Sequence, residues 1–169
     1  MAFSFDDESR TRELSRTGAV LALRAPLHVY GVSAFVLHLC VGMVAMLWAA
    51  SGDVNFTSDD AQFLAVTALI ASTVTAATVG SALYRNEISG AAALVFRTSV
   101  IWAALAAVWP LSTLLPDLFD HAGTIGSVDD LTKPVIAQGA RMLASAWEGA
   151  LGGGAAALVV SLLCVERRE

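Results

Sequence analysis

The stretch that decides the fold is Val29–Ala50, VYGVSAFVLHLCVGMVAMLWAA. It lies within a run from Ala25 to Gly52 that contains no Asp, Glu, Lys or Arg. As an α-helix, these 22 residues would span roughly 33 Å, which is enough to cross the hydrocarbon core of a bilayer. The sequence therefore predicts a first membrane-spanning helix here.

The composition of the whole chain also favours a lipid bilayer as its surroundings. Of its 169 residues, 56% are hydrophobic and only 15% are charged. The mean hydropathy is +0.67, whereas soluble domains carry about 25% charged residues. A water-soluble fold of this size would have to expose much of that apolar surface, so we expect an integral membrane protein.

Three further apolar runs complete a predicted all-α bundle of four membrane helices. The spans are expected at about 29–50, 61–84, 95–115 and 144–165, within a membrane domain of residues 27–165. A polar N-terminal segment, 1–26, precedes this domain, and a short tail, 166–169, follows it. The loops between spans one and two and between spans three and four are expected at 51–60 and 116–143.

Two helix starts can be read from the sequence. Thr57-Ser58-Asp59-Asp60 offers a capping hydroxyl followed by carboxylates, which suit the positive end of a helix dipole. Thr132 can cap a helix with Pro134 in its first turn, where proline is tolerated. That last helix would be about 33 residues long, so its first part should project from the membrane or lie on it.

Basic residues predict the orientation. Four spans place both chain ends on one side, and eight of the ten basic residues fall there: Arg10, Arg12, Arg16, Arg24, Arg85, Arg97, Arg167 and Arg168. Only Lys133 and Arg141 fall on the other side, together with seven of the nine aspartates. Because short cytoplasmic segments are enriched in Lys and Arg, both termini are predicted to be cytoplasmic, in the cell membrane.

His38 is the first candidate for a functional residue. It is the one ionisable side chain near the middle of the first span, and such groups usually face the interior of a bundle. Small residues share its helix face: Gly31, Ala34, Gly42, Ala45 and Ala49. The second span offers Ser72, Thr73 and Thr75 at similar depth. His38 is then either a neutral histidine bonded to a hydroxyl, or part of a proton or ion path lined by these residues.

A cofactor bound through His38 is a further alternative. Haem needs a second axial ligand, and the other histidines are His28, near the boundary of the same helix, and His121, in the outer loop. Neither can face His38 across one haem within a monomer, although a symmetric dimer could pair two copies of His38. A haem- or quinone-binding membrane anchor therefore stays open, while no metal cluster is expected.

The fourth span contains the remaining candidates. Glu148 lies about one turn inside its outer end, where it is either a snorkelling carboxylate or a gate of an ion path. Gly149 and Gly153 form a Gly-x-x-x-Gly pattern, which favours close helix contact within the bundle or between copies. The two cysteines, Cys40 and Cys164, lie at different depths and are not expected to pair.

Sequence motifs of several other classes of protein are absent. The sequence contains no phosphate-binding glycine loop, no Ser-His-Asp order, no zinc-ligand spacing and no basic patch for nucleic acid. No span has an acidic residue at mid-depth, which argues against a proton-coupled drug pump. We therefore expect a non-enzymatic, oligomeric or accessory membrane component without a cofactor, whose partners are the lipid bilayer and other copies or membrane proteins. A small channel or transporter using His38 is the first alternative.

Overall fold

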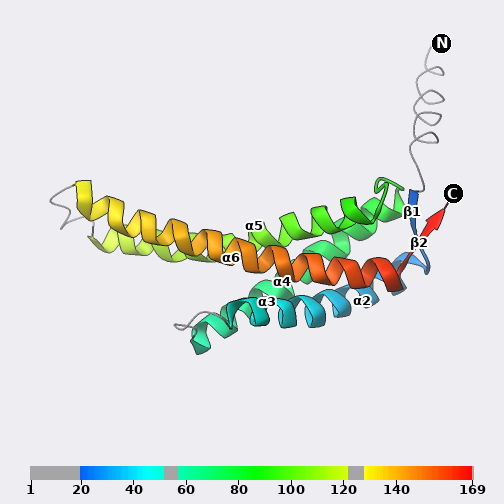
Figure 1. Ribbon diagram of the computed structural model, residues 1–169, viewed down its shortest axis with the longest axis horizontal. Coiled ribbons are helices and arrows are strands. Elements are labelled where there is room, and N and C mark those ends of the chain that lie inside the picture. The colour runs from blue at the N-terminus through cyan, green and yellow to red at the C-terminus, as the bar shows by residue number, and fades with distance from the viewer. Residues whose placement is uncertain (1–19, 52–56, 122–127, 169) are drawn as a thin grey trace, which may run out of the picture.

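The computed structural model describes residues 20–51, 57–121 and 128–168, and they form four long helical segments and a two-stranded ribbon (Figure 1). In chain order the elements are β1 (Val20–Leu23), α2 (Leu27–Leu37), the π turn η1 (His38–Gly42), α3 (Met43–Ala50), α4 (Ser58–Tyr84), α5 (Ala91–His121), α6 (Val128–Leu163) and β2 (Val165–Arg168). The protein is mostly helical, as predicted.

Four helical segments are long and apolar enough to cross a membrane. They are Leu27–Ala50, Ser58–Tyr84, Ala91–Val108 and Val135–Leu163. The first comprises α2, η1 and α3 in one continuous helix and contains the whole of the predicted first span. The prediction of four helices with membrane-span character is therefore confirmed.

The start of α4 follows the predicted capping pattern. The backbone N–H of Asp60 donates to the Thr57 hydroxyl (3.3 Å), and the Asp60 carboxylate accepts from the Thr57 backbone N–H (2.8 Å). This reciprocal capping box satisfies backbone donors that a helix start leaves free. Sequence and structure agree here because the signal is local.

The hairpin of α5 and α6 is longer than the sequence indicated. α5 has 31 residues and α6 has 36, so α6 is roughly 54 Å long. The two helices run side by side and extend beyond the end of α3 (Figure 1). The long last helix was predicted, but it begins at Val128 and not at a cap on Thr132, and α5 continues to His121. Much of the segment 116–143 that was expected to connect the spans is therefore helix.

The two strands correct the expectation of an all-α fold with polar ends. β1 pairs with β2 in antiparallel register, Val20 opposite Arg168 and Leu23 opposite Val165. Val165, expected in the fourth span, and Glu166–Arg168, expected in a tail, are thus in a strand. The main-chain N–H of Leu21 also donates to the carbonyl of Ile88, between α4 and α5 (3.1 Å). Such long-range pairing has no local sequence signature, which is why it was missed.

Large apolar side chains cover the outside of the helices. Val32, Val44 and Leu162 are each more than 60% exposed, as is Trp48. Soluble monomers rarely expose so many large apolar groups along every long helix. This surface is compatible with a lipid environment.

The core consists of two apolar clusters. The cluster nearer the strands includes Ala34, Val79, Leu94, Ile88 and Val165. The other includes Met46, Ala71, Trp102 and Ala106. Along α4, Thr75 lies between Val79 and Ala71, and along the first helix His38 lies between Ala34 and Met46. A polar layer therefore separates the two apolar clusters.

Candidate functional site at His38

The polar layer joins side chains from three helical segments. His38 comes from η1, Ser72 and Thr75 come from α4, and Thr98 comes from α5. All four are at most 1% exposed. Trp102, one turn beyond Thr98, is also fully buried. The first helix thus brings its one mid-span ionisable group to the centre of the bundle, as its flanking small residues suggested.

The hydrogen bond of His38 fixes which ring nitrogen carries the proton. Its Nδ1 lies 2.6 Å from the carbonyl oxygen of Ala34, one turn earlier. A carbonyl can only accept, so Nδ1 is the protonated nitrogen. In the neutral ring Nε2 is then a bare acceptor, and this buried atom has no hydrogen-bond partner among the described residues.

The indole of Trp102 lies beside this imidazole. The ring centroids are 6.4 Å apart and the ring planes are inclined by 31°. Trp102 Nε1 is a buried donor that likewise has no partner in the part of the chain that the structure describes. An unpaired acceptor and an unpaired donor therefore occupy neighbouring rings.

Glycines make room for Trp102. A β-carbon on Gly149 would lie 2.6 Å from the Trp102 carbonyl oxygen, and one on Gly153 would lie 2.7 Å from Trp102 Cγ. Gly42, the last residue of η1, faces the far edge of the same indole and leaves no room for a β-carbon. The Gly149–Gly153 face is thus used within the chain. Gly31, grouped with these in the sequence, has open space where a β-carbon would point.

The hydroxyls of α4 divide between two faces. Ser72 is buried and donates to the Ala68 carbonyl (2.6 Å), whereas the Thr75 hydroxyl, also buried, has no partner among the described residues. Thr73 is exposed and donates to the Leu69 carbonyl (2.9 Å), so it faces away from His38. Helical spacing accounts for this split, because residues three apart share a face and adjacent residues do not.

Sequence reasoning missed Thr98 and Trp102. Thr98 Oγ1 is another buried group with no partner in the described segments. The sequence does indicate that these two residues lie together, since Thr98 and Trp102 are four residues apart and share a helix face. Both were treated only as part of a charge-free run because neither is ionisable.

Glu148 lies outside the layer. It is partly buried on α6, directly before Gly149, whose neighbours are Trp102 and Ala106. Trp102 and Ala106 belong to the second apolar cluster, so Glu148 lies at the level of that cluster. A role of Glu148 as a gate stays a prediction.

The layer contains groups for proton exchange and few for metal binding. Within residues 20–51, 57–121 and 128–168, no group of three His, Cys, Asp or Glu side chains could hold a metal ion. His28 is exposed at the start of α2, and the side chain of His121 lies outside the described part. Haem or quinone binding through His38 stays a prediction that a visible spectrum of the purified protein tests.

No family model matches the chain, and no curated protein or solved structure is similar to it by sequence or by fold.

Proposed function

We propose that the chain is a small, non-enzymatic multi-pass protein of the cell membrane, with both termini in the cytoplasm. We further propose that the layer at His38 relays protons or small cations. Four apolar helices support the membrane assignment. The pairing of β1 with β2 supports an even number of crossings, because hydrogen-bonded strands lie on the same side of a membrane.

Interfacial side chains support the orientation. Trp48 is strongly exposed and lies near the end of the first helix that is remote from the strands. Arg24, Arg85 and Arg97 lie nearer the strand end. Tryptophan favours membrane interfaces and arginine favours the cytoplasmic side, which together suit a cytoplasmic ribbon.

The observation that carries the relay proposal is the unpaired Nε2 of His38 beside the unpaired Nε1–H of Trp102. A buried polar group without a partner costs about 1–3 kcal/mol, and native proteins usually satisfy it with water or a ligand. One water molecule between the two rings would accept from Trp102 and donate to His38. Histidine exchanges protons near neutral pH, so this arrangement suits proton transfer.

Two further features agree with a relay. π turns inside α-helices are frequent at functional sites, and η1 begins at His38. Towards the strands, the hydroxyl of Tyr30 is buried with no partner among the described residues. It lies two turns from His38 and provides the next polar group in that direction. The apolar clusters on both sides of the layer would limit leakage of ions through the bundle.

Reconstitution tests the relay. The protein is placed in liposomes containing a pH-sensitive dye, and proton, K⁺ and Na⁺ fluxes are measured for the wild type, His38→Gln and His28→Gln. We expect His38→Gln to lower one of these fluxes to that of empty liposomes, and His28→Gln to leave it unchanged, since His28 is exposed on the same helix. Equal flux in all three proteins, or none in the wild type, would reject the relay.

An accessory or oligomeric role is the second candidate, and the long α5–α6 hairpin favours it. On α6, Ile136, Leu143 and Trp147 are 72%, 75% and 64% exposed, at spacings of seven and four residues. Such spacing places them on one helix face, as in a coiled-coil seam. Ile136→Ser should lower the mass of the detergent-solubilised complex measured by light scattering, whereas Val32→Ser on α2 should not. A wild-type monomer would contradict self-association.

A further inference from the structure

A groove between α4 and α5 combines an apolar lining with one cation. Its volume is about 280 Å³, and it lies in the halves of both helices that are nearer the strands. α4 contributes Thr78, Val79 and Ala82, and α5 contributes Phe96, Arg97 and Val100. Phe96 and Val100 are at least half exposed, so the groove opens to the surface that would face lipid.

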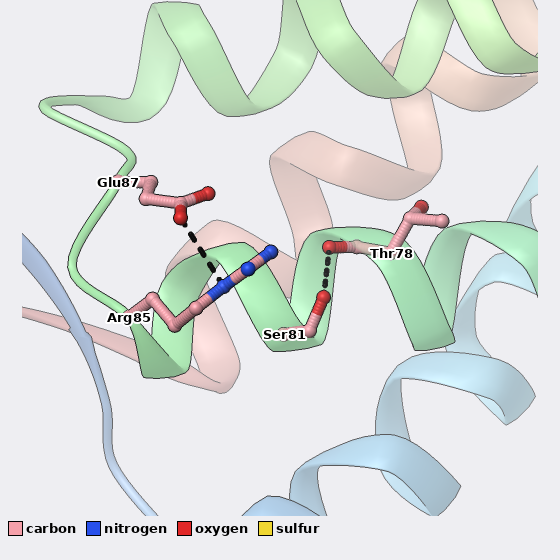
Figure 2. A network of polar contacts seen from close by, with 4 residues as sticks. All are labelled: Thr78, Ser81, Arg85 and Glu87. Atoms are coloured by element: carbon pink, nitrogen blue, oxygen red, sulfur yellow. Dashed lines mark hydrogen bonds and ion pairs between the residues drawn. The ribbon is translucent and has the colours of Figure 1, made fainter.

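Within residues 20–51, 57–121 and 128–168, no carboxylate forms an ion pair with Arg97. Arg85 Nε and Glu87 Oε1 form a side-chain ion pair, 3.2 Å apart. Figure 2 shows this pair just beyond the end of α4, with Ser81 and Thr78 on the preceding turns. Arg85 therefore has an acidic neighbour, whereas the guanidinium of Arg97 has no carboxylate bonded to it in the described segments.

The depth of Arg97 suits a lipid headgroup. It lies six residues after Ala91, so its Cα is roughly 9 Å inside the start of α5. Long side chains on a helix lean towards its N-terminus, which here is the end near the strands. The guanidinium would thus reach the level of phosphates while the groove below it stays within the hydrocarbon.

From this arrangement we propose that the groove binds an anionic phospholipid, with its phosphate on Arg97 and one acyl chain along Phe96 and Val100. Arginine pairs with phosphate through parallel N–H donors, and basic pockets between membrane helices favour anionic headgroups. The proposal rests on the membrane location proposed above, but it is independent of the His38 relay.

A second groove provides a contrast within the same helix pair. At the opposite ends of α4 and α5, a groove of about 470 Å³ is lined by Phe63, Val66 and Leu105, with Asp59 and Gln62 among its polar residues. A carboxylate in that position would repel an anionic headgroup. The preference for anionic lipid is therefore assigned to the Arg97 groove alone.

Native mass spectrometry tests the site. The full chain in detergent is mixed with equimolar phosphatidylglycerol and phosphatidylcholine of identical acyl chains, and bound lipid is counted. We expect the wild type to prefer phosphatidylglycerol, and Arg97→Gln to lower this preference about fivefold, as expected for one interfacial charge. Arg97→Lys should retain most of it. Val100→Trp, which fills the groove and keeps the charge, should lower the binding of both lipids.

Matched variants separate this site from general surface charge. Arg85→Gln removes a basic residue near the same end, and Asp59→Asn removes the carboxylate of the other groove; neither should change the preference. Inorganic phosphate at the same concentration should not displace the lipid. An unchanged preference in Arg97→Gln, or an equal loss in Arg85→Gln, would overturn the proposal. Flux through His38 is measured separately, so failure of the relay leaves this result interpretable.

Discussion

The imidazole of His38 and the indole of Trp102 lie 6.4 Å apart between ring centroids, and each ring carries a buried nitrogen with no partner in the described segments. They come from helices that are far apart in the sequence, and η1 and α5 bring them to the same depth. Trp102 is held there by glycines from two other segments. Trp102 therefore both fills the space between the helices and places a polar N–H group beside His38.

Replacing Trp102 should destabilise the bundle strongly. Trp102→Ala would leave a large cavity, and such changes cost about 3–5 kcal/mol. Trp102→Phe retains much of the ring and removes the unpaired N–H, so its cost should be smaller. Unfolding in detergent measures both. Trp48→Ala, at a 76% exposed position, is the control and should have little effect.

The glycines against Trp102 should not tolerate a methyl group. Gly149→Ala and Gly153→Ala would each place a β-carbon under 3 Å from Trp102, so α5 and α6 would have to separate. We expect lower thermal stability in both variants. Gly139→Ala is the matched control, since its β-carbon meets nothing within 4 Å; it should stabilise α6 by about 0.5–1 kcal/mol. Loss of stability in all three variants would contradict the packing described for Trp102.

The capping box of α4 should contribute measurably to stability. Removing an N-cap hydroxyl costs about 1 kcal/mol, and Thr57→Ala should do so here. Asp60→Ala should have a similar effect, because its carboxylate accepts from both the backbone N–H and the hydroxyl of Thr57. Ser58→Ala, at the next position, is the control. In chemical unfolding, the free energy of unfolding should be lower for Thr57→Ala and Asp60→Ala than for Ser58→Ala and the wild type.

The ribbon depends on a buried residue between α4 and α5. Ile88 is fully buried against it, and truncation of such a side chain costs about 2–5 kcal/mol. Ile88→Ala should therefore lower the unfolding temperature. Glu87→Ala, which removes an exposed ion pair with Arg85, should change it little, because surface pairs contribute about 0–1 kcal/mol. Equal stability of both variants would show that the ribbon is not packed as described.

The cysteines provide a pH-dependent prediction. Both thiols are free, as predicted. Burial raises the pKa of Cys164, and Arg24 offsets part of this shift. The thiolate is the reactive form, so a higher pKa means less of it at neutral pH. Maleimide labelling of Cys164 should be slower than in the unfolded chain and should accelerate as the pH rises. Rapid labelling of the folded protein at neutral pH would contradict this.

Periodicity and charge allowed the long helices to be predicted, but not how far they run. The first span, the start of α4 and the polar face of Ser72 and Thr75 follow from local patterns. The extension of α5 to His121 does not, because Pro110 and Pro116 are residues that usually kink or end a helix. Gln138, for example, donates to the carbonyl of Pro110 on the facing helix, a contact that no local pattern indicates.

The site was predictable in part. The central position of His38 follows from the small residues on its face. The sequence places Thr98 and Trp102 on one helix face, but nothing in it states that this face meets His38. Thr73 was included with Ser72 and Thr75 on depth alone, and its exposure shows that angular position on the helix decides as much as depth.

The ribbon of β1 and β2 makes the described chain nearly circular, since its first and last elements are hydrogen-bonded neighbours. The chain could therefore begin at a different helix while the helices keep the same neighbours in the bundle. A short linker from Arg168 to Val20, with new ends in the segment 122–127, would give a circular permutant with the same helix contacts. The permuted chain would begin with α6 and end with α5, at the ends of these helices that are remote from the ribbon.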